Sequence, residues 1–185
     1  MFNFILLVVV VGGLLWAVGL YNRFVTLIQR SEEAWADIEV QLKRRYDLIP
    51  NLVETVKGYA KHEEGTLTKV VEARNMAMAS GSDIASQAKA QNMLTDALKS
   101  VFALSEAYPD LKANQSFLAL QTELTDTENK VQAARRFYNG NVRDLNTAML
   151  QFPGNLIAGM FHFSKKEYFD LPDNDVAQQP VAVKF

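Results

Sequence analysis

Residues 41–53 read QLKRRYDLIPNLV, and they decide whether the first helix of the chain ends or continues. Asp47 lies three residues before Pro50, which is the spacing of a helix cap followed by a first-turn proline. A proline also disfavours helical backbone at the residue before it, which is Ile49 here. The stretch therefore predicts a corner, at which one helix ends and another begins.

Three basic residues, Lys43, Arg44 and Arg45, precede this predicted corner. In the last turn of a helix, cations oppose the negative end of the helix dipole, which gives all three a structural use. Basic clusters near a cytoplasmic membrane face also attract anionic lipids. The alternative interpretation of Lys43, Arg44 and Arg45 is therefore a patch that docks a partner protein or a lipid.

Apolar or small residues recur at spacings of three and four on both sides of residues 41–53. This spacing predicts amphipathic helices. The sequence has no sustained alternation of apolar and polar residues, which is the pattern that would predict a strand. The apolar stripes occupy four segments, at residues 27–42, 49–71, 84–108 and 117–149. The turn-forming residues ASGSD at 79–83 and the Tyr108-Pro109 pair separate the later segments. The sequence therefore predicts an all-α fold, with an antiparallel four-helix bundle of long helices.

The run FILLVVVVGGLLWAVGL, residues 4–20, contains no charged side chain. About 17–25 apolar residues span a bilayer as a helix, so the run predicts a single transmembrane anchor. A cleaved signal peptide is the alternative, because Ala17-Val18-Gly19 resembles a cleavage site. The basic residues that open such peptides are absent before Phe4, and this absence favours the anchor.

The charges that flank the anchor predict its orientation. No Lys or Arg precedes it, whereas Arg23 and Arg30 follow it closely. The positive-inside rule then predicts a single-pass protein of the cytoplasmic membrane, with its N-terminus outside and its C-terminal domain in the cytoplasm. We expect an anchor at 1–22, a four-helix bundle at 23–151, and a C-terminal flap and extended tail at 152–185. Within the flap, the apolar residues 155–163 contact either the membrane or protein.

Composition and motifs offer little support for catalysis. The net charge of the 185 residues is −2 and cysteine is absent, which excludes disulfides and zinc–thiolate sites. No concentrated basic face indicates a nucleic-acid partner. The stretch HEEGT at 62–66 lacks the second histidine of a zinc-protease motif. We therefore predict a protein that is not an enzyme, with no catalytic, cofactor-binding or metal-binding residues.

Four stretches stand out in order along the chain. They are YNRFV (21–25), AWADIEVQLKRRYDLIPNLVETVKGYAKHE (34–63), YPDLKANQSFLALQTELTDTENKVQAARRFYN (108–139) and FPGNLIAGMF (152–161). Together they resemble the LemA family of bacterial membrane proteins. The resemblance implies an N-terminal membrane helix with its N-terminus outside the cell and a cytoplasmic four-helix bundle. It supplies no catalytic residues.

Two functions remain open from the sequence. The first is a scaffold that self-assembles at the bacterial inner membrane and organises or shapes the bilayer. Gly13 and Ala17 have the small-xxx-small spacing that lets transmembrane helices approach closely, so we expect a homo-oligomer packed through these residues. The second function is a monomeric adaptor whose cytoplasmic bundle docks a membrane enzyme or a signalling protein. The size of the particle in a bilayer distinguishes the two.

Overall fold

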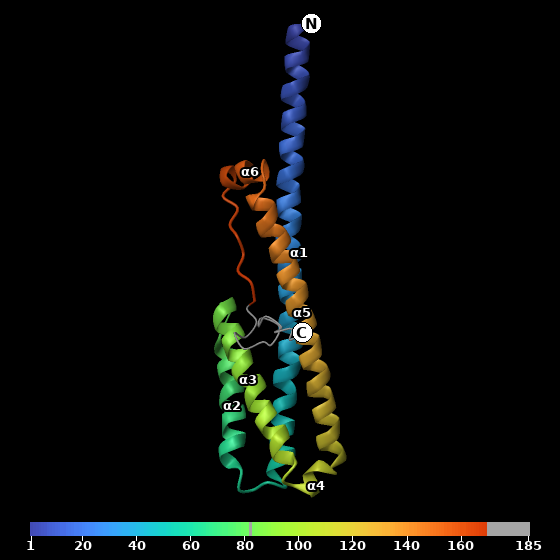
Figure 1. Cartoon of the computed structure of the whole chain (residues 1–185), viewed down its shortest axis with the longest axis vertical. Helices are drawn as coiled ribbons and strands as arrows, with labels where there is room; N and C mark the ends of the chain where they lie inside the picture. Colours follow the sequence, from blue (N-terminus) through green and yellow to red (C-terminus); the bar gives the residue numbers. More distant parts are fainter. Residues whose placement is uncertain (82, 170–185) are drawn as a thin grey trace, which may run out of the picture. The chain divides into compact units, whose positions relative to one another are not determined.

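The computed structural model describes residues 1–81 and 83–169, and this part of the chain is helical and contains no β-strand (Figure 1). The all-α prediction is therefore confirmed for the described residues. The extended tail predicted within 152–185 lies, from residue 170 onward, outside the description. In chain order the helices are α1 (Phe2–Lys57), α2 (Glu64–Ala79), α3 (Ile84–Ser105), α4 (Pro109–Lys112), α5 (Gln115–Leu150) and α6 (Gly154–Met160).

The corner predicted at residues 41–53 is wrong, because α1 runs through this stretch without a break (Figure 1). Asp47 and Pro50 both lie in the interior of α1, so Asp47 caps no helix. The packing of the flanking residues explains why the helix continues: Leu42, Ile49 and Leu52 are all almost completely buried. Burying such a side chain contributes about 1.5–3 kcal/mol, so together the three offset a proline penalty of about 3 kcal/mol.

The chain turns at other places, each with a local cause. Between α1 and α2, the backbone N–H groups of Tyr59 and Ala60 both donate to the carbonyl of Val56, which closes the last turn of α1. Between α2 and α3, Gly81 has φ +66°, a left-handed conformation that favours glycine. Asp83 then caps α3, since its carboxylate accepts a hydrogen bond of 2.9 Å from the Ser86 N–H.

The described residues fall into two compact units. Unit 1 comprises residues 1–38 and 133–168, and unit 2 comprises residues 39–81 and 83–132 together with Phe169. Both α1 and α5 contribute one segment to each unit. The units follow contacts, whereas the division predicted at residues 22/23 and 151/152 follows changes of composition.

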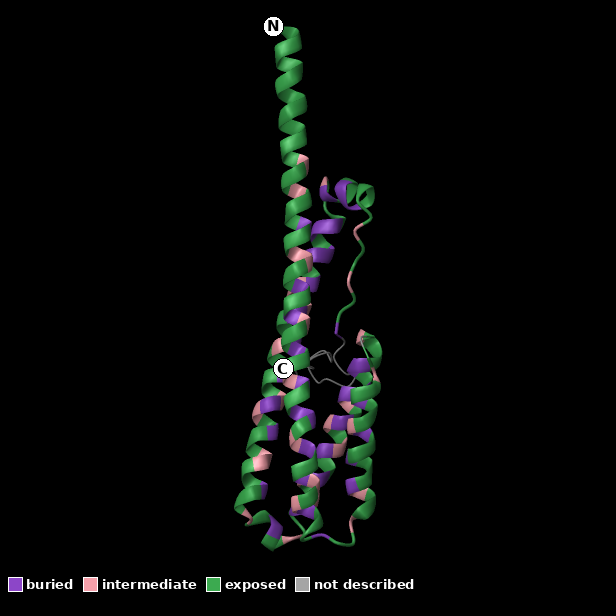
Figure 2. Ribbon diagram, turned by 180° about the vertical axis from the view of Figure 1, so that it is seen from behind, coloured by how far each residue is buried: buried purple, intermediate pink, exposed green. Residues whose placement is uncertain are grey.

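Unit 2 is built from helices that each turn one apolar stripe inward, and these buried stripes are visible in Figure 2. α2 and α3 pack against each other after the turn at Gly81. Asn114 caps α5, because its Oδ1 accepts a hydrogen bond of 2.9 Å from the Phe117 N–H. The buried apolar residues of the later helices include Leu67 and Val70 of α2, Leu94, Leu98 and Val101 of α3, and Phe117, Leu124 and Val131 of α5.

Candidate functional site

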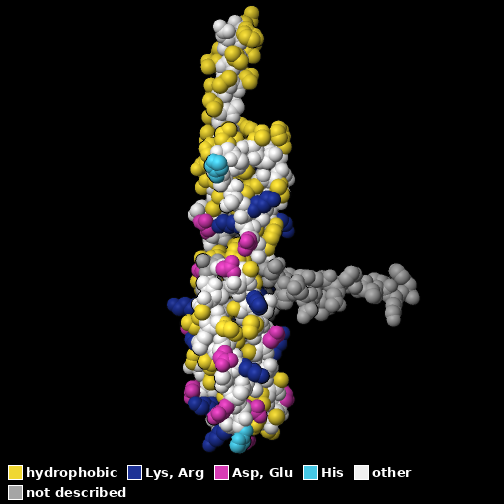
Figure 3. Space-filling model, turned by 90° about the vertical axis from the view of Figure 1, so that its left-hand side faces the viewer, with side chains coloured by type: hydrophobic (Ala, Val, Ile, Leu, Met, Phe, Trp, Pro, Cys, Tyr) yellow, Lys and Arg dark blue, Asp and Glu magenta, His cyan; other side chains and the backbone are white. Residues whose placement is uncertain are grey.

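The N-terminal part of α1 exposes an apolar surface on every side. All residues from Met1 to Trp16 are exposed, as Figure 2 shows. In the face seen in Figure 3, hydrophobic side chains cover this segment and charged ones are absent from it. Among the described helices, α1 is the one that is long and apolar enough to cross a membrane, and no residue of its most apolar stretch is buried. Leaving so much apolar surface in water is unfavourable, so this segment requires a different surrounding.

Gly13 and Ala17, the predicted packing pair of the anchor, have different surroundings. At Gly13, no atom lies within 4 Å of the position that a Cβ would occupy. Ala17 is partly buried, because it packs against a hydrophobic cluster of unit 1. Gly13 is thus open to another helix, while Ala17 already contacts its own chain. Packing of two anchors through this pair stays a prediction.

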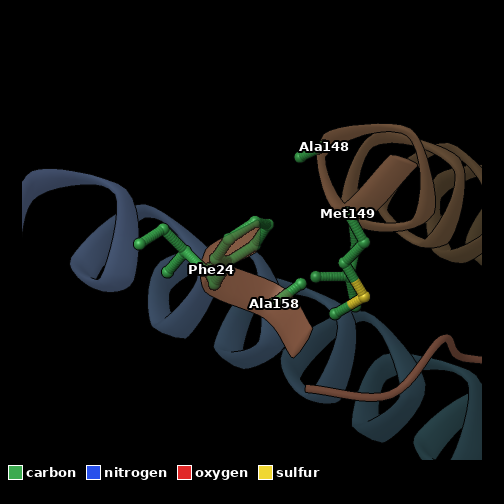
Figure 4. Close-up of a cluster of buried hydrophobic side chains, with 6 residues drawn as sticks. Phe24, Ala148, Met149 and Ala158 are labelled. Carbon is green, nitrogen blue, oxygen red and sulfur yellow. The ribbon is translucent and has the colours of Figure 1, made fainter. Parts of the chain in front are cut away.

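That cluster joins α1, α5 and α6 within unit 1, and Figure 4 shows Phe24 of α1 and Met149 of α5 together with Ala158 of α6. Its buried members are Phe24, Leu145, Ala148, Met149, Ile157 and Ala158. No local pattern in the sequence links Phe24 to residues 145–158.

Gly154 permits α6 to approach the other two helices. A Cβ at Gly154 would stand 2.5 Å from the Ala148 carbonyl oxygen and 3.2 Å from Cζ of Phe24. The first distance is too short for any side chain, and the atom in the way belongs to the backbone. Glycine at this position is therefore a condition of the α6 packing seen here.

Aromatic rings extend the contact between α6 and α1. The ring of Tyr21 lies 4.9 Å from that of Phe161 and 5.4 Å from that of Phe163, centroid to centroid, and Phe24 also lies 5.3 Å from Phe163. Such edge and tilted contacts each contribute about 0.5–1.5 kcal/mol beyond their burial. The end of α6 is thus held beside the last residues of the apolar run.

After α6 the chain continues without helix along residues 163–169 and is tied to α5. The side chain of Asn146 makes two hydrogen bonds to the backbone of Lys166, one donated by its Nδ2 at 2.9 Å and one accepted by its Oδ1 at 3.1 Å. The Tyr138 hydroxyl donates to the Glu167 carbonyl at 2.9 Å. The chain after α6 is thereby tied to α5 at Lys166 and Glu167.

Beside the cluster, a shallow groove of about 630 Å³ is lined by basic residues from two helices. Arg23 and Arg30 contribute from α1, and Arg143 contributes from α5. Asp144 is the acidic residue of this lining, and its carboxylate lies 3.5 Å from Nε of Arg143. The groove therefore carries a net positive charge.

The structure separates the basic cluster Lys43, Arg44 and Arg45. Arg45 is 2% exposed, so it does not belong to a surface patch, and that part of the patch hypothesis is corrected. The cause is the continuous helix, which turns Arg45 toward the core of unit 2. Lys43 and Arg44 remain exposed, and Arg44 lies 3.9 Å from each of the carboxylates of Glu123 and Asp126. Contact of Lys43 and Arg44 with lipid or a partner stays a prediction.

Arg45 is instead the centre of a buried polar network. Its guanidinium lies 2.8 Å from the Glu128 carboxylate of α5 and donates a hydrogen bond of 2.8 Å to the Thr95 hydroxyl of α3. Burial lowers the pKa of Arg45, and the negative charge of Glu128 opposes this shift. Loss of one partner of such a pair is strongly destabilising. A shift of the helices that separated Arg45 from Glu128 would therefore be unfavourable, so the network favours one register in unit 2.

Tyr46 extends this network toward α2 and α3. Its hydroxyl accepts hydrogen bonds from the side-chain amides of Gln87, at 3.3 Å, and of Gln91, and it donates to the Ala77 carbonyl at 3.3 Å. The backbone carbonyl of Tyr46 accepts a hydrogen bond of 2.8 Å from Nε of Arg74. Arg45 and Tyr46 together thus connect α1 to α2, α3 and α5.

The described residues contain no group of three or more His, Cys, Asp and Glu side chains that could hold a metal ion. His62 is exposed in the segment between α1 and α2.

Several known proteins are similar to this chain in sequence. The magnetosome protein MamQ of Magnetospirillum gryphiswaldense and MamQ 2 of Paramagnetospirillum magneticum are each 23% identical over 174 residues, covering 80% of this chain. This chain spans only 64% of the length of those two proteins. Protein LemA of Metamycoplasma hominis is 26% identical over 159 residues, which cover 85% of this chain and 73% of that protein. The LemA family model matches residues 34–185, which include the last three of the four stretches, so the resemblance is confirmed and the chain belongs to the LemA family.

Proposed function

We propose that this protein is a non-enzymatic scaffold that is anchored in the cytoplasmic membrane by the N-terminal part of α1 and self-assembles there. The observation that carries the proposal is the apolar run at residues 4–20, which contains no charged residue and is exposed throughout residues 4–16. At about 1.5 Å per residue this run is about 26 Å long, close to the roughly 30 Å of a bilayer's hydrocarbon core.

In this proposal the anchor remains part of the mature protein. Cleavage after Gly19 would cut α1 in its interior and remove Ala17 from the cluster of unit 1. By the positive-inside rule, Arg23 and Arg30 favour the cytoplasmic side for the part of the chain that follows the anchor. Within this proposal, the segments of α1, α2, α3 and α5 that belong to unit 2 form an antiparallel four-helix bundle, which is shorter than the one predicted at 23–151.

Self-assembly is supported by the open surface at Gly13. Transmembrane helices gain little from apolarity against one another, because lipid is equally apolar, so they associate where small residues allow close approach. At both Gly12 and Gly13, no atom lies within 4 Å of the position that a Cβ would occupy. The two residues lie on different faces of α1, about 100° apart.

The experiment measures particle mass in nanodiscs for the full-length protein and for Gly13→Ile and Gly12→Ile variants. We expect the wild type to form a homo-oligomer that Gly13→Ile weakens and Gly12→Ile preserves. A wild type that is strictly monomeric at all concentrations contradicts the scaffold and supports the alternative, a monomeric adaptor.

A groove of about 510 Å³, lined by residues of α2 and α3, favours the adaptor. Met76 and Met93 both line this groove and are each 45% exposed. Methionine side chains adapt to partners of different shape, which makes such surfaces suited to binding other proteins. The adaptor would use this groove to dock a membrane enzyme or a signalling protein.

A further inference from the structure

We propose that the outer face of α6 is a second membrane-contact site, which inserts into the same lipid leaflet from which the anchor emerges. The inserting residues are Phe152, Leu156, Met160 and Phe161. The inference rests on the proposed membrane anchoring and adds a lipid surface to it, bound by a part of the chain that is distant from the anchor in sequence.

α6 and its flanking residues present apolar side chains on two faces. Ile157 and Ala158 are buried in the cluster of unit 1. Leu156 and Met160 lie four residues apart in α6, so they share a face, and they are 59% and 70% exposed. Phe152, in the turn before α6, is 80% exposed. A cluster of large, exposed apolar side chains marks a surface that contacts a partner or a membrane.

The position of α6 along α1 indicates a lipid partner. Phe161 contacts Tyr21 with a ring separation of 4.9 Å, and Tyr21 directly follows the apolar run that ends at Leu20. A bilayer that surrounds this run places Tyr21 where hydrocarbon meets headgroups, the depth at which aromatic residues gather in membrane proteins. Because Phe161 lies beside Tyr21, the exposed face of α6 is continuous with the surface of the anchor.

The charges around α6 fit the same environment. The stretch from Leu145 to Phe163 contains no Lys, Arg, Asp or Glu, so its insertion removes none of these charges from water. Basic residues flank it instead: Arg23 and Arg143 line the adjacent groove, and Lys165 follows α6. Anionic lipid phosphates attract such residues at the membrane surface, whereas a water-soluble partner would give no reason for this arrangement beside the anchor.

The chain contains no cysteine, so a single introduced cysteine carries a nitroxide label without further changes. Full-length variants labelled at Leu156 or Met160 are reconstituted in vesicles of phosphatidylethanolamine and phosphatidylglycerol. A label at Phe137 of α5 is the matched control, since Phe137 is 58% exposed, as Leu156 is at 59%, and also belongs to unit 1. A label at Val10 reports on the anchor. Electron paramagnetic resonance then compares collisions with oxygen, which concentrates in lipid, with collisions with a water-soluble nickel chelate.

We expect the labels at Leu156, Met160 and Val10 to collide preferentially with oxygen, and the label at Phe137 to collide preferentially with nickel. The proposal is overturned if Leu156 and Met160 resemble Phe137 while Val10 still reports lipid. Shielding of both labels from both reagents also overturns it, since a protein would then cover the face. A nickel-accessible Val10 contradicts the membrane anchor itself, so the two failures are distinguishable.

Discussion

At the scale of single residues, Pro50 leaves one carbonyl of α1 without its usual backbone donor, and Arg74 supplies another. In a helix the N–H of residue 50 would donate to the carbonyl of Tyr46, and proline has no N–H. Nε of Arg74 donates to that carbonyl at 2.8 Å instead. A charged donor from α2 thus replaces the missing backbone donor, which helps α1 continue through a proline.

Because Arg74 takes the place of the missing donor at Pro50, the effects of mutations at these two positions on stability should be coupled. Arg74→Met should lower the free energy of unfolding by about 1–3 kcal/mol, because a partly buried carbonyl loses its donor. In a Pro50→Ala background the loss should shrink, since the alanine at that position supplies a backbone N–H. Thermal unfolding of the four proteins in mild detergent, followed by circular dichroism, measures the coupling. Equal losses in both backgrounds would contradict it.

The substitution Asp47→Ala distinguishes the corner predicted at residues 41–53 from the continuous helix α1. If Asp47 capped a helix, its replacement by alanine would lower the free energy of unfolding by about 0.5–2 kcal/mol. Asp47 is exposed in the interior of α1, where alanine is the better helix former. We therefore expect Asp47→Ala to leave the melting temperature unchanged or to raise it. A clear decrease in the melting temperature would contradict the continuous helix and support the predicted corner.

Arg45 and its neighbour Arg44 form a matched pair for the buried network. Arg45→Met should destabilise the protein by about 3 kcal/mol, because it leaves Glu128 without its cation. Arg44→Met should change stability by less than about 1 kcal/mol, since exposed ion pairs contribute little. Chemical unfolding of the two variants in detergent measures the difference, and equal effects would contradict a special role for Arg45.

At the scale of elements, the sequence contained a signal that favours the continuous helix. Ile38, Leu42, Arg45, Ile49, Leu52 and Val56 alternate spacings of four and three, and all six are buried. Local rules at Asp47 and Pro50 predicted a break, but the unbroken stripe prevails because packing in unit 2 outweighs local propensity. Apolar runs and turn residues made the apolar N-terminal part of α1 and the break near Gly81 predictable. The cluster of Phe24 with Ala158 was not, because a contact so distant in sequence has no local pattern.

The docking of α6 depends on Gly154, and a second glycine in the same helix provides the control. Gly154→Ala should displace α6, because the new Cβ would stand 2.5 Å from the Ala148 carbonyl oxygen. Gly159→Ala should not, since no atom lies within 4 Å of its Cβ position. A cysteine at Ile157, which is 8% exposed, should therefore react faster with a thiol reagent only in the Gly154→Ala variant. Equal rates in both variants would show that α6 tolerates the added methyl group.

At the scale of the whole molecule, the scaffold and the adaptor share one requirement, which is that α1 crosses the membrane. The apolar run at residues 4–20 and the first basic residues after it, Arg23 and Arg30, support this topology. In both functions the chain presents helical surface on the cytoplasmic side of the membrane.

Thiol labelling in intact cells tests that topology most directly, because the native chain contains no cysteine. One variant carries Asn3→Cys before the apolar run, and the other carries Ser100→Cys on the exposed surface of α3. With a membrane-impermeant reagent, we predict that the cysteine at position 3 is labelled in intact cells. The cysteine at position 100 should be labelled only after the membrane is disrupted. Labelling at position 100 in intact cells would contradict the cytoplasmic location of unit 2 and, with it, the proposed function.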